Sequence, residues 1–164
     1  MKTINRFLIF SLSLFFSGII AAGKIPEPSH GIAYPEGWQD WSAIAVSHRI
    51  DNHTLRVILG NEIAVKAARS GNINPWPDGA VLGKVVWKDS QLENWQKATA
   101  PGRFVHAEFM FKDSDKYADT YGWGWARWVG LEQKPFQKGS QICTGCHTPV
   151  KGRDWVFTEP AALP

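Results

Sequence analysis

The sequence predicts a mainly β domain of the α+β kind, with an antiparallel sheet of about five strands and a few short helices. Short β-rich segments follow one another between turn residues. The 15 glycines and 10 prolines are spread too widely for long helices. Successive strands with few helices between them favour an antiparallel sheet. The 164 residues suffice for one globular domain, and 44% hydrophobic residues exclude a disordered chain.

Turn residues set the limits of the expected elements. Asp51 and Asn52 form a turn between the first two strands. A short helix is expected over 61–70, and a second over 114–121, ended by Gly122. In the first of these helices, Asn61 and Gly71 are suited to be the cap and the stop. The expected strands are, in order, 43–49, 54–59, 80–87, 103–111 and 123–129.

Residues 1–22 have the layout of a secretory signal peptide. Two positive charges precede an apolar run, Phe7 to Ala22, which ends in small residues. A single membrane anchor is the alternative, but the run has 16 residues, whereas a spanning helix needs about 20. We therefore expect cleavage near Ala22, export to the periplasm, and a mature domain over residues 23–164.

The charge of the mature chain is nearly balanced. The formal net charge is +3, from 18 basic and 15 acidic residues. Two of the basic residues belong to the expected leader, so 18 minus 2 leaves 16 against 15. This balance gives no reason to expect a nucleic acid or another polyanion as partner.

The two cysteines lie together in Cys143-Thr144-Gly145-Cys146-His147. Cys-x-x-Cys-His is the attachment signal for c-type haem. Each thiol adds to one vinyl group, and the adjacent histidine is placed under the iron as its proximal ligand. A zinc site would need two more ligands at short spacing, and no other cysteine exists. A redox Cys-x-x-Cys usually opens a helix early in a βαβ unit, whereas the motif of this chain lies near its C-terminus. The sequence thus predicts one covalent haem c, bound through Cys143, Cys146 and His147, with His147 ligating the iron.

A sixth ligand is not evident. Only 17 residues follow His147, and none of them is Met. Met110 lies between two phenylalanines and is better interpreted as an apolar gap-filler. We expect a five-coordinate iron with an open distal face, which favours small-ligand chemistry over simple electron relay. The other histidines are each interpreted as surface or strand residues, namely His30, His48, His53 and His106.

Three charged residues interrupt the expected strands, namely Arg56, Lys84 and Glu108. Charges among apolar neighbours are costly to bury unless they are paired. One interpretation is that this face of the sheet is solvated. The other is a charged cluster above a haem, in which Arg56 holds a propionate or an anion. In that cluster Glu108 relays protons, and Lys84 pairs with a propionate or reacts with the macrocycle.

Several stretches of the chain resemble one known family. Beside the Cys-x-x-Cys-His motif, the Asp-Gly turn followed by the strand that bears Lys84 is the most discriminating of them. From about Gly37 to its C-terminus, the chain resembles the cytochrome P460 family, which includes the β-sheet cytochromes c′. The other matching stretches are Gly-Trp-Gln-Asp-Trp at 37–41, His-Ala-Glu-Phe-Met-Phe-Lys-Asp-Ser at 106–114, Trp-Gly-Trp-Ala-Arg-Trp at 123–128 and Asp-Trp-Val-Phe-Thr at 154–158.

The resemblance implies a mostly antiparallel β domain, usually a homodimer, with a five-coordinate haem on its sheet. P460 enzymes oxidise hydroxylamine and pass the electrons to a periplasmic redox partner. In these enzymes a strand lysine is joined covalently to a haem meso carbon, and Lys84 matches its position. A distal glutamate assists proton removal and matches Glu108, and a strand arginine near the haem matches Arg56. Gly83 departs from the pattern, because a glycine there could loosen the strand and shift the Lys84 amine.

The resemblance leaves more than one function open. The c′-β members lack the cross-link and bind NO or CO under a Phe-rich distal cap. Phe104, Phe109 and Phe111 are candidates for such a cap in this chain. The sequence therefore supports two hypotheses, a P460-type hydroxylamine oxidoreductase and a non-catalytic NO- or CO-binding protein. A plain electron carrier is a third and weaker alternative.

Overall fold

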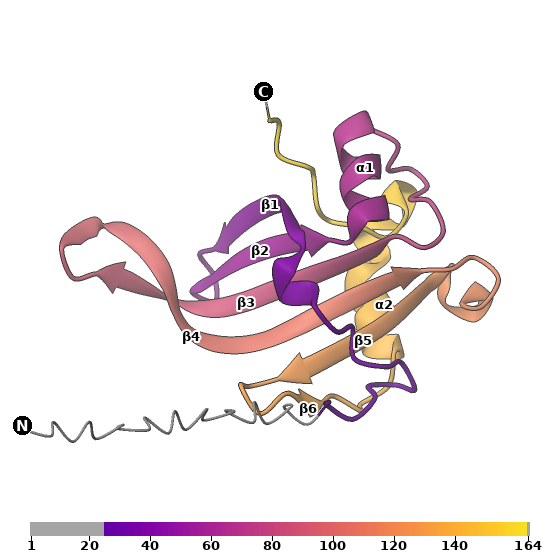
Figure 1. The fold of residues 1–164 in the computed structure, drawn as a ribbon, viewed down its shortest axis with the longest axis horizontal. Coiled ribbons are helices and arrows are strands. Elements are labelled where there is room, and N and C mark those ends of the chain that lie inside the picture. Colours follow the sequence, from indigo (N-terminus) through magenta and orange to yellow (C-terminus); the bar gives the residue numbers. More distant parts are fainter. Residues whose placement is uncertain (1–24, 164) are drawn as a thin grey trace, which may run out of the picture.

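A six-stranded antiparallel sheet forms the centre of the computed structural model, which describes residues 25–163 (Figure 1). Each strand pairs with its neighbours in sequence, so the sheet order is β1 to β6. The predicted mainly β class is therefore confirmed. The predicted leader, with its cleavage near Ala22, lies outside the described residues. The strands are β1 (Ser42–Arg49), β2 (Thr54–Gly60), β3 (Val81–Leu92), β4 (Trp95–Lys112), β5 (Trp123–Val129) and β6 (Lys134–Pro135).

Strands β3 and β4 are longer than predicted. Beyond the core of the sheet they continue as a two-stranded hairpin that projects from it (Figure 1). Most side chains of residues 88–103 are exposed, so this segment lacked the apolar alternation on which the prediction of strands depended. Backbone pairing between the two arms holds the hairpin together instead.

The helices are short. Helix α1 (Glu62–Ser70) has the predicted ends, because the side chain of Asn61 accepts a hydrogen bond from Ala64 N and Gly71 adopts φ 74°. Helix α2 (Gln141–His147) carries the Cys-x-x-Cys-His motif. Within the described part of the chain, three 3-10 turns complete the set, at Trp38–Asp40, Ala118–Thr120 and Thr148–Arg153. No helix of the described range, 25–163, has the length and apolar character to cross a membrane.

The helix predicted over 114–121 is wrong. Only the single 3-10 turn Ala118–Thr120 forms there. The segment is folded back on itself, because Tyr117 O accepts Gly122 N and Gly122 O accepts Asp113 N. Tyr121 and Gly122 both take positive φ values, which end any helix and return the chain into β5.

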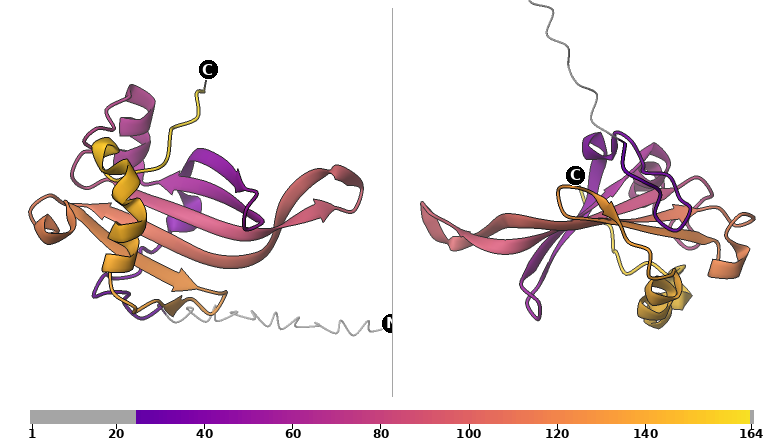
Figure 2. Two further views of the ribbon diagram at one scale, coloured as in Figure 1. Left: turned by 180° about the vertical axis from the view of Figure 1, so that it is seen from behind. Right: turned by 90° about the horizontal axis from the view of Figure 1, so that it is seen from below.

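The two faces of the sheet have different covers. Residues 25–41 lie across one face, whereas α2 and the C-terminal segment lie on the other (Figure 2). On the first face a buried aromatic and aliphatic cluster forms around Trp38, Phe109 and Trp128. Side chains alternate along each strand, so the neighbours of these residues, Glu108 and Arg127, point to the second face. A second buried cluster, which includes Trp76, Trp123 and Trp125, joins α1 and the C-terminal segment to the sheet.

Candidate functional site

Four neighbouring strands place one residue each in a row across the second face. Ile58 is opposite Lys84, Lys84 is opposite Glu108, and Glu108 is opposite Arg127. Three of these four residues are charged, and they lie in the middle of the sheet. The antiparallel register therefore brings together charges that are far apart in the sequence.

Helix α2 covers this row and leaves a cavity between itself and the sheet. The cavity is lined from the sheet by Lys84, Glu108 and Arg127, and from the helix by Cys143, Cys146 and His147. Apolar side chains form most of the remaining wall. The sequence-predicted attachment motif and two of the three predicted charged residues thus face one common space. The apolar part of the wall consists of Ile58, Leu82, Phe109, Met110, Trp125, Ala126, Ile142, Val156 and Phe157.

His147 is fixed in orientation. Its Nδ1 lies 2.7 Å from the carbonyl oxygen of Trp155. Its ring meets the rings of Trp125 and Phe157 edge-on, at centroid distances of 4.7 and 4.9 Å. Burial lowers the pKa of His147, and the Trp155 carbonyl acts in the opposite sense. A neutral imidazole that donates from Nδ1 keeps the Nε2 lone pair free for a metal.

The two cysteines are available for covalent attachment. Both are free thiols, and both line the cavity. Cys143 is half-buried, and burial raises its pKa, whereas Cys146 is exposed. One turn of α2 thus presents two thiols and the imidazole of His147 to the same space.

Glu108 is the centre of the charged group on the sheet. Its carboxylate forms ion pairs with Lys84 and Arg127, and His106 Nε2 lies 3.4 Å from its Oε1. Burial alone would raise the pKa of Glu108, but Lys84, His106 and Arg127 lower it to about 2. Glu108 is therefore ionised at neutral pH.

His106 lies beside this group and does not act as a surface residue. It is two positions from Glu108 on β4, so both side chains point to the same face. Burial lowers the pKa of His106 to about 4, against the opposing effect of Glu108. A neutral imidazole is thus held in contact with an ionised carboxylate.

Arg56 lies near the charged group without joining it. It is half-buried on β2, and its Nε is 3.4 Å from Thr54 Oγ1. Burial lowers the pKa of Arg56. Arg56 lines a second hollow, which shares Ile58 and Phe157 with the cavity. In the described structure no ion pair links Arg56 to Glu108, so its predicted role depends on a group that spans both hollows.

The phenylalanines considered for a distal cap pack into the buried cluster of the first face. Phe109 packs against Trp38 and Trp128, at ring-centroid distances of 5.7 and 5.8 Å. Phe104 and Phe111 pack against the same buried cluster. Alternation along β4 accounts for Phe109 and Phe111, because Glu108 faces the cavity. The register shift between Phe104 and His106 breaks the alternation before Phe104. Phe104 and Phe111 do not line the cavity, so the expectation of a cap is wrong for these two, whereas Phe109 is one of the residues of the cavity wall.

The positions of His48, His53 and Met110 are as predicted, but His30 is neither a strand nor a surface residue, because it lies in a turn and its ring Nε2 is buried. His30 Nδ1 lies 2.9 Å from Trp125 O, and His48 Nε2 lies 2.9 Å from Asp89 Oδ2. His53 is exposed. None of these three histidines lines the cavity described above. Met110 packs against the buried cluster that includes Trp76, Trp123 and Trp125, and it forms part of the cavity wall.

Arg127 is the site residue that the sequence prediction missed. It lies in the Trp-rich stretch 123–128, which drew attention to aromatic packing. Side chains alternate along that strand, so Arg127 points to the same face of the sheet as Trp125, whereas Trp128 points to the other face. Its position opposite Glu108 follows only from the register between β4 and β5. Phe136 covers the guanidinium at 4.5 Å from the ring centroid.

The residues around the cavity fit a haem. The wall is mostly apolar, two thiols open to it, and His147 keeps one nitrogen free. Among the described residues, Trp125 Nε1 and Arg127 Nε are buried nitrogen atoms without a hydrogen-bond partner. Buried donors without partners are costly. A group with carboxylate substituents, such as the haem propionates, would supply acceptors for such donors.

Comparison with known families agrees with this chemistry. The family model described as Cytochrome P460 matches residues 35–158, which include the strands, the charged row and the Cys-x-x-Cys-His motif. No curated protein matches the sequence. The match covers most of the chain, and the family supports a c-type haem cytochrome. The chain therefore belongs to the cytochrome P460 family.

Proposed function

We propose that this protein is a periplasmic mono-haem enzyme that oxidises hydroxylamine. Its haem c is bound covalently through Cys143 and Cys146, and His147 ligates the iron from one side. The observation that carries the proposal is the polar cavity floor, where Glu108 is paired with Lys84 and Arg127. Of the phenylalanines considered for a gas-binding cap, Phe104 and Phe111 do not line the cavity, and Phe109 belongs to the buried cluster of the opposite face as well as to the cavity wall. When bound, the haem supplies the iron that accepts electrons from a small nitrogenous ligand.

The protein's own groups position the ligand and take up protons. Oxidation of hydroxylamine releases protons as well as electrons, so a base must lie beside the bound ligand. Glu108 is the ionised carboxylate on the cavity wall, and His106 offers a neutral imidazole next to it. Arg56, which lines the adjoining hollow, is suited to hold an anionic group. The electrons leave to a periplasmic redox partner, and we propose a homodimer as the working form.

Lys84 links the basicity of Glu108 to the proposed cross-link. A carboxylate with a pKa of about 2 is a weak base, and Lys84 is the cation that lowers this pKa most. A bond from the Lys84 nitrogen to a meso carbon would replace one N–H and one C–H bond, and the two protons and two electrons released would have to be accepted by a two-electron oxidant such as a peroxide. An amine bonded to the macrocycle loses its positive charge, so the pKa of Glu108 would rise. The cross-link would thus improve the base as well as tune the haem.

A non-catalytic NO- or CO-binding protein is the second candidate. The observation in its favour is the ion pair itself, because an ammonium held by Glu108 is not a nucleophile. In this case no bond joins Lys84 to the haem, and the charged residues on the sheet side of the cavity bind the ligand without taking up protons from it.

The optical spectrum and the mass of the purified holoprotein test the proposal. A bond between Lys84 and the haem should displace the ferrous Soret band to the red of an ordinary haem c. It should also lower the intact mass by two hydrogens relative to the sum of apoprotein and haem. Turnover of hydroxylamine with an artificial electron acceptor completes the expected result. An ordinary haem c spectrum without turnover would contradict the enzyme and favour the gas-binding protein.

A further inference from the structure

We infer that the buried ion pair between Lys112 and Asp154 is a positioning device for His147. It holds the turn at Asp154 and Trp155 so that the Trp155 carbonyl stays under Nδ1 of the imidazole. The inference rests on the proposed function, because it takes His147 as the iron ligand. Neither Lys112 nor Asp154 lines the haem cavity, so both act on the site from a distance.

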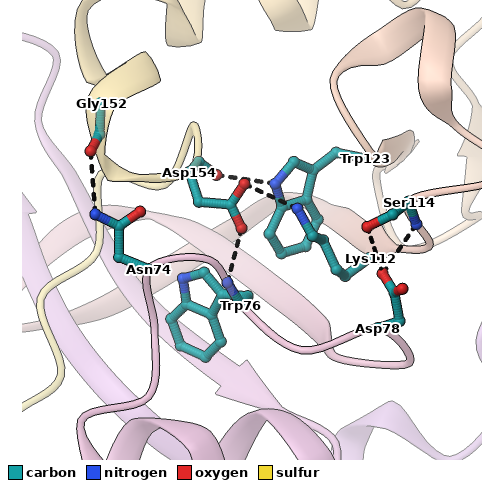
Figure 3. A network of polar contacts seen from close by, with 8 residues as sticks. All are labelled: Asn74, Trp76, Asp78, Lys112, Ser114, Trp123, Gly152 and Asp154. Carbon is teal, nitrogen blue, oxygen red and sulfur yellow. Dashed lines mark hydrogen bonds and ion pairs between the residues drawn. The ribbon is translucent and has the colours of Figure 1, made fainter.

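The ion pair is isolated from solvent. The side chains of Lys112 and Asp154 are only 6% and 10% exposed, and Nζ lies 2.8 Å from Oδ1 (Figure 3). Two charges at this depth lose much hydration, which their attraction offsets only when the geometry is good. The ammonium also lies 5.0 Å from the centroid of the Trp123 ring. Because the partners are 42 residues apart, the pair ties the C-terminal segment to the end of β4.

Two further hydrogen bonds fix Asp154. Its second carboxylate oxygen, Oδ2, accepts the backbone N–H of Trp76 at 2.8 Å. Its backbone carbonyl accepts the indole N–H of Trp123, also at 2.8 Å (Figure 3). Together with Lys112, three separate segments of the chain therefore meet at this one residue. Asp154 is bound to the rigid end of the sheet and not merely to its own turn.

The backbone at this point is held in an unfavourable conformation. Asp154 has φ 49° and Trp155 has φ 64°, so two consecutive residues other than glycine are left-handed. The left-handed conformation is unfavourable for residues with a side chain, and a bulky residue such as tryptophan has no local preference for it. Contacts elsewhere must impose this turn. The anchored carboxylate of Asp154 holds the first residue of the turn in this conformation. The second residue is held by its ring, because Trp155 stacks on Tyr121 with the ring centroids 4.0 Å apart.

The result of the turn is the position of one carbonyl group. It reverses the chain after the 3-10 turn Thr148–Arg153, so that Trp155 O reaches His147 Nδ1 at 2.7 Å. A hydrogen bond from the distant nitrogen of a ligating histidine orients the ring and raises its basicity. Lys112 and Asp154 thus set the donor strength of His147 through the Trp155 carbonyl.

The Asp154→Asn variant of the holoprotein tests this inference. Asparagine still tolerates the left-handed conformation and still accepts from Trp76 N, so the substitution removes mainly the charge. The readouts are the Fe–His stretching band of the ferrous protein, by resonance Raman spectroscopy, and the midpoint potential. We expect the band to shift to lower wavenumber and the potential to become more positive, at unchanged haem content. Asp78→Asn is the control, because Asp78 accepts from Ser114 nearby without contacting Asp154 (Figure 3).

A second variant protects the test against loss of folding. Lys112→Met combined with Asp154→Asn leaves no unpaired buried charge, and we expect it to fold and to show the same shift. An unchanged Fe–His band and potential in either folded variant would overturn the inference. Failure of both variants to fold would make the pair a folding element and would also overturn it. A wild-type protein without haem, or without an Fe–His band, would contradict the proposed function instead.

Discussion

Glu108 and Lys84 occupy directly opposed positions on β4 and β3, and their charged groups are ion-paired inside the cavity that the two cysteines line. The pair joins the candidate base to the candidate cross-linking residue. A change at either residue therefore alters the electrostatics of the other. Arg127, opposite Glu108 on β5, completes the arrangement.

Replacement of Glu108 tests its role as a base. Glu108→Gln keeps the shape of the side chain but cannot take up a proton at neutral pH. We expect kcat/KM for hydroxylamine to fall by about 10²- to 10⁴-fold, which is typical of the loss of a general base. Haem content should be unchanged. Glu93→Gln, at an exposed position of the β3–β4 hairpin, is the matched control. Unaltered turnover in the Glu108 variant would rule out the proton-transfer role.

Replacement of Lys84 tests the cross-link. Lys84→Arg retains a cation that can pair with Glu108, but a guanidinium stays protonated and cannot form the bond. We expect an ordinary haem c spectrum and recovery of the two missing hydrogens in the intact mass. If the spectrum and mass of the variant equal those of the wild type, Lys84 has no covalent role.

Arg127 should control the pH range in which Glu108 is ionised. Its guanidinium is one of the cations that lower the pKa of Glu108. In the Arg127→Gln variant the pKa of Glu108 should therefore rise. Because the base must be ionised, the acid limb of the pH dependence of kcat/KM should move to higher pH. Lys134→Gln, an exposed cation on β6, should leave the profile in place. An acid limb that does not move in the Arg127 variant would contradict the assignment.

His106 should make the folded state sensitive to acid. Its pKa is about 4 in the folded protein, against about 6.5 in an unfolded chain. The unfolded chain binds the proton first, so the contribution is complete above pH 6.5 and is lost as the pH falls toward 4. In the His106→Gln variant, the loss of unfolding free energy between pH 6.5 and pH 4 should be smaller than in the wild type by up to about 3 kcal/mol.

Urea denaturation at several pH values measures the His106 effect. The slope of the free energy of unfolding against pH, between about 4 and 6.5, should be smaller in the His106 variant than in the wild type. His53→Gln is the control, because the His53 side chain is 73% exposed. Equal slopes in the wild type and the His106 variant would show that His106 is not held neutral.

Gly83 should tolerate no side chain. A Cβ built at this position would lie 2.8 Å from Cε1 of Phe109 on the neighbouring strand. Gly83→Ala should therefore destabilise the protein by roughly 1–3 kcal/mol, as overpacking usually does. Gly152→Ala is the control, because no atom lies within 4 Å of its Cβ position. Equal denaturation midpoints for the two variants would contradict this account of Gly83.

The sequence alone predicted the parts of the site that depend on local pattern. Residue spacing identified Cys143, Cys146 and His147, and mid-strand charge identified Lys84 and Glu108. The alternation that places Glu108 on the cavity side also turns Phe109 toward the buried cluster of the opposite face. The helix cap at Asn61 was equally local and is confirmed.

Other features required the register or the tertiary contacts. Arg127 belongs to the site because β5 pairs with β4 in one particular alignment. Lys112 and Asp154 meet across 42 residues of sequence, and residue spacing gives no sign that the two are paired. The exposed hairpin of β3 and β4 has no apolar alternation, so its pairing could not be predicted from residue type.

Electron paramagnetic resonance of the purified ferric holoprotein tests the central claim most directly. The claim is that a haem bound through Cys143 and Cys146 has His147 as its only protein ligand. We predict a high-spin ferric signal that changes on addition of hydroxylamine or NO. A low-spin signal in the resting protein, from two strong protein ligands, would contradict the account.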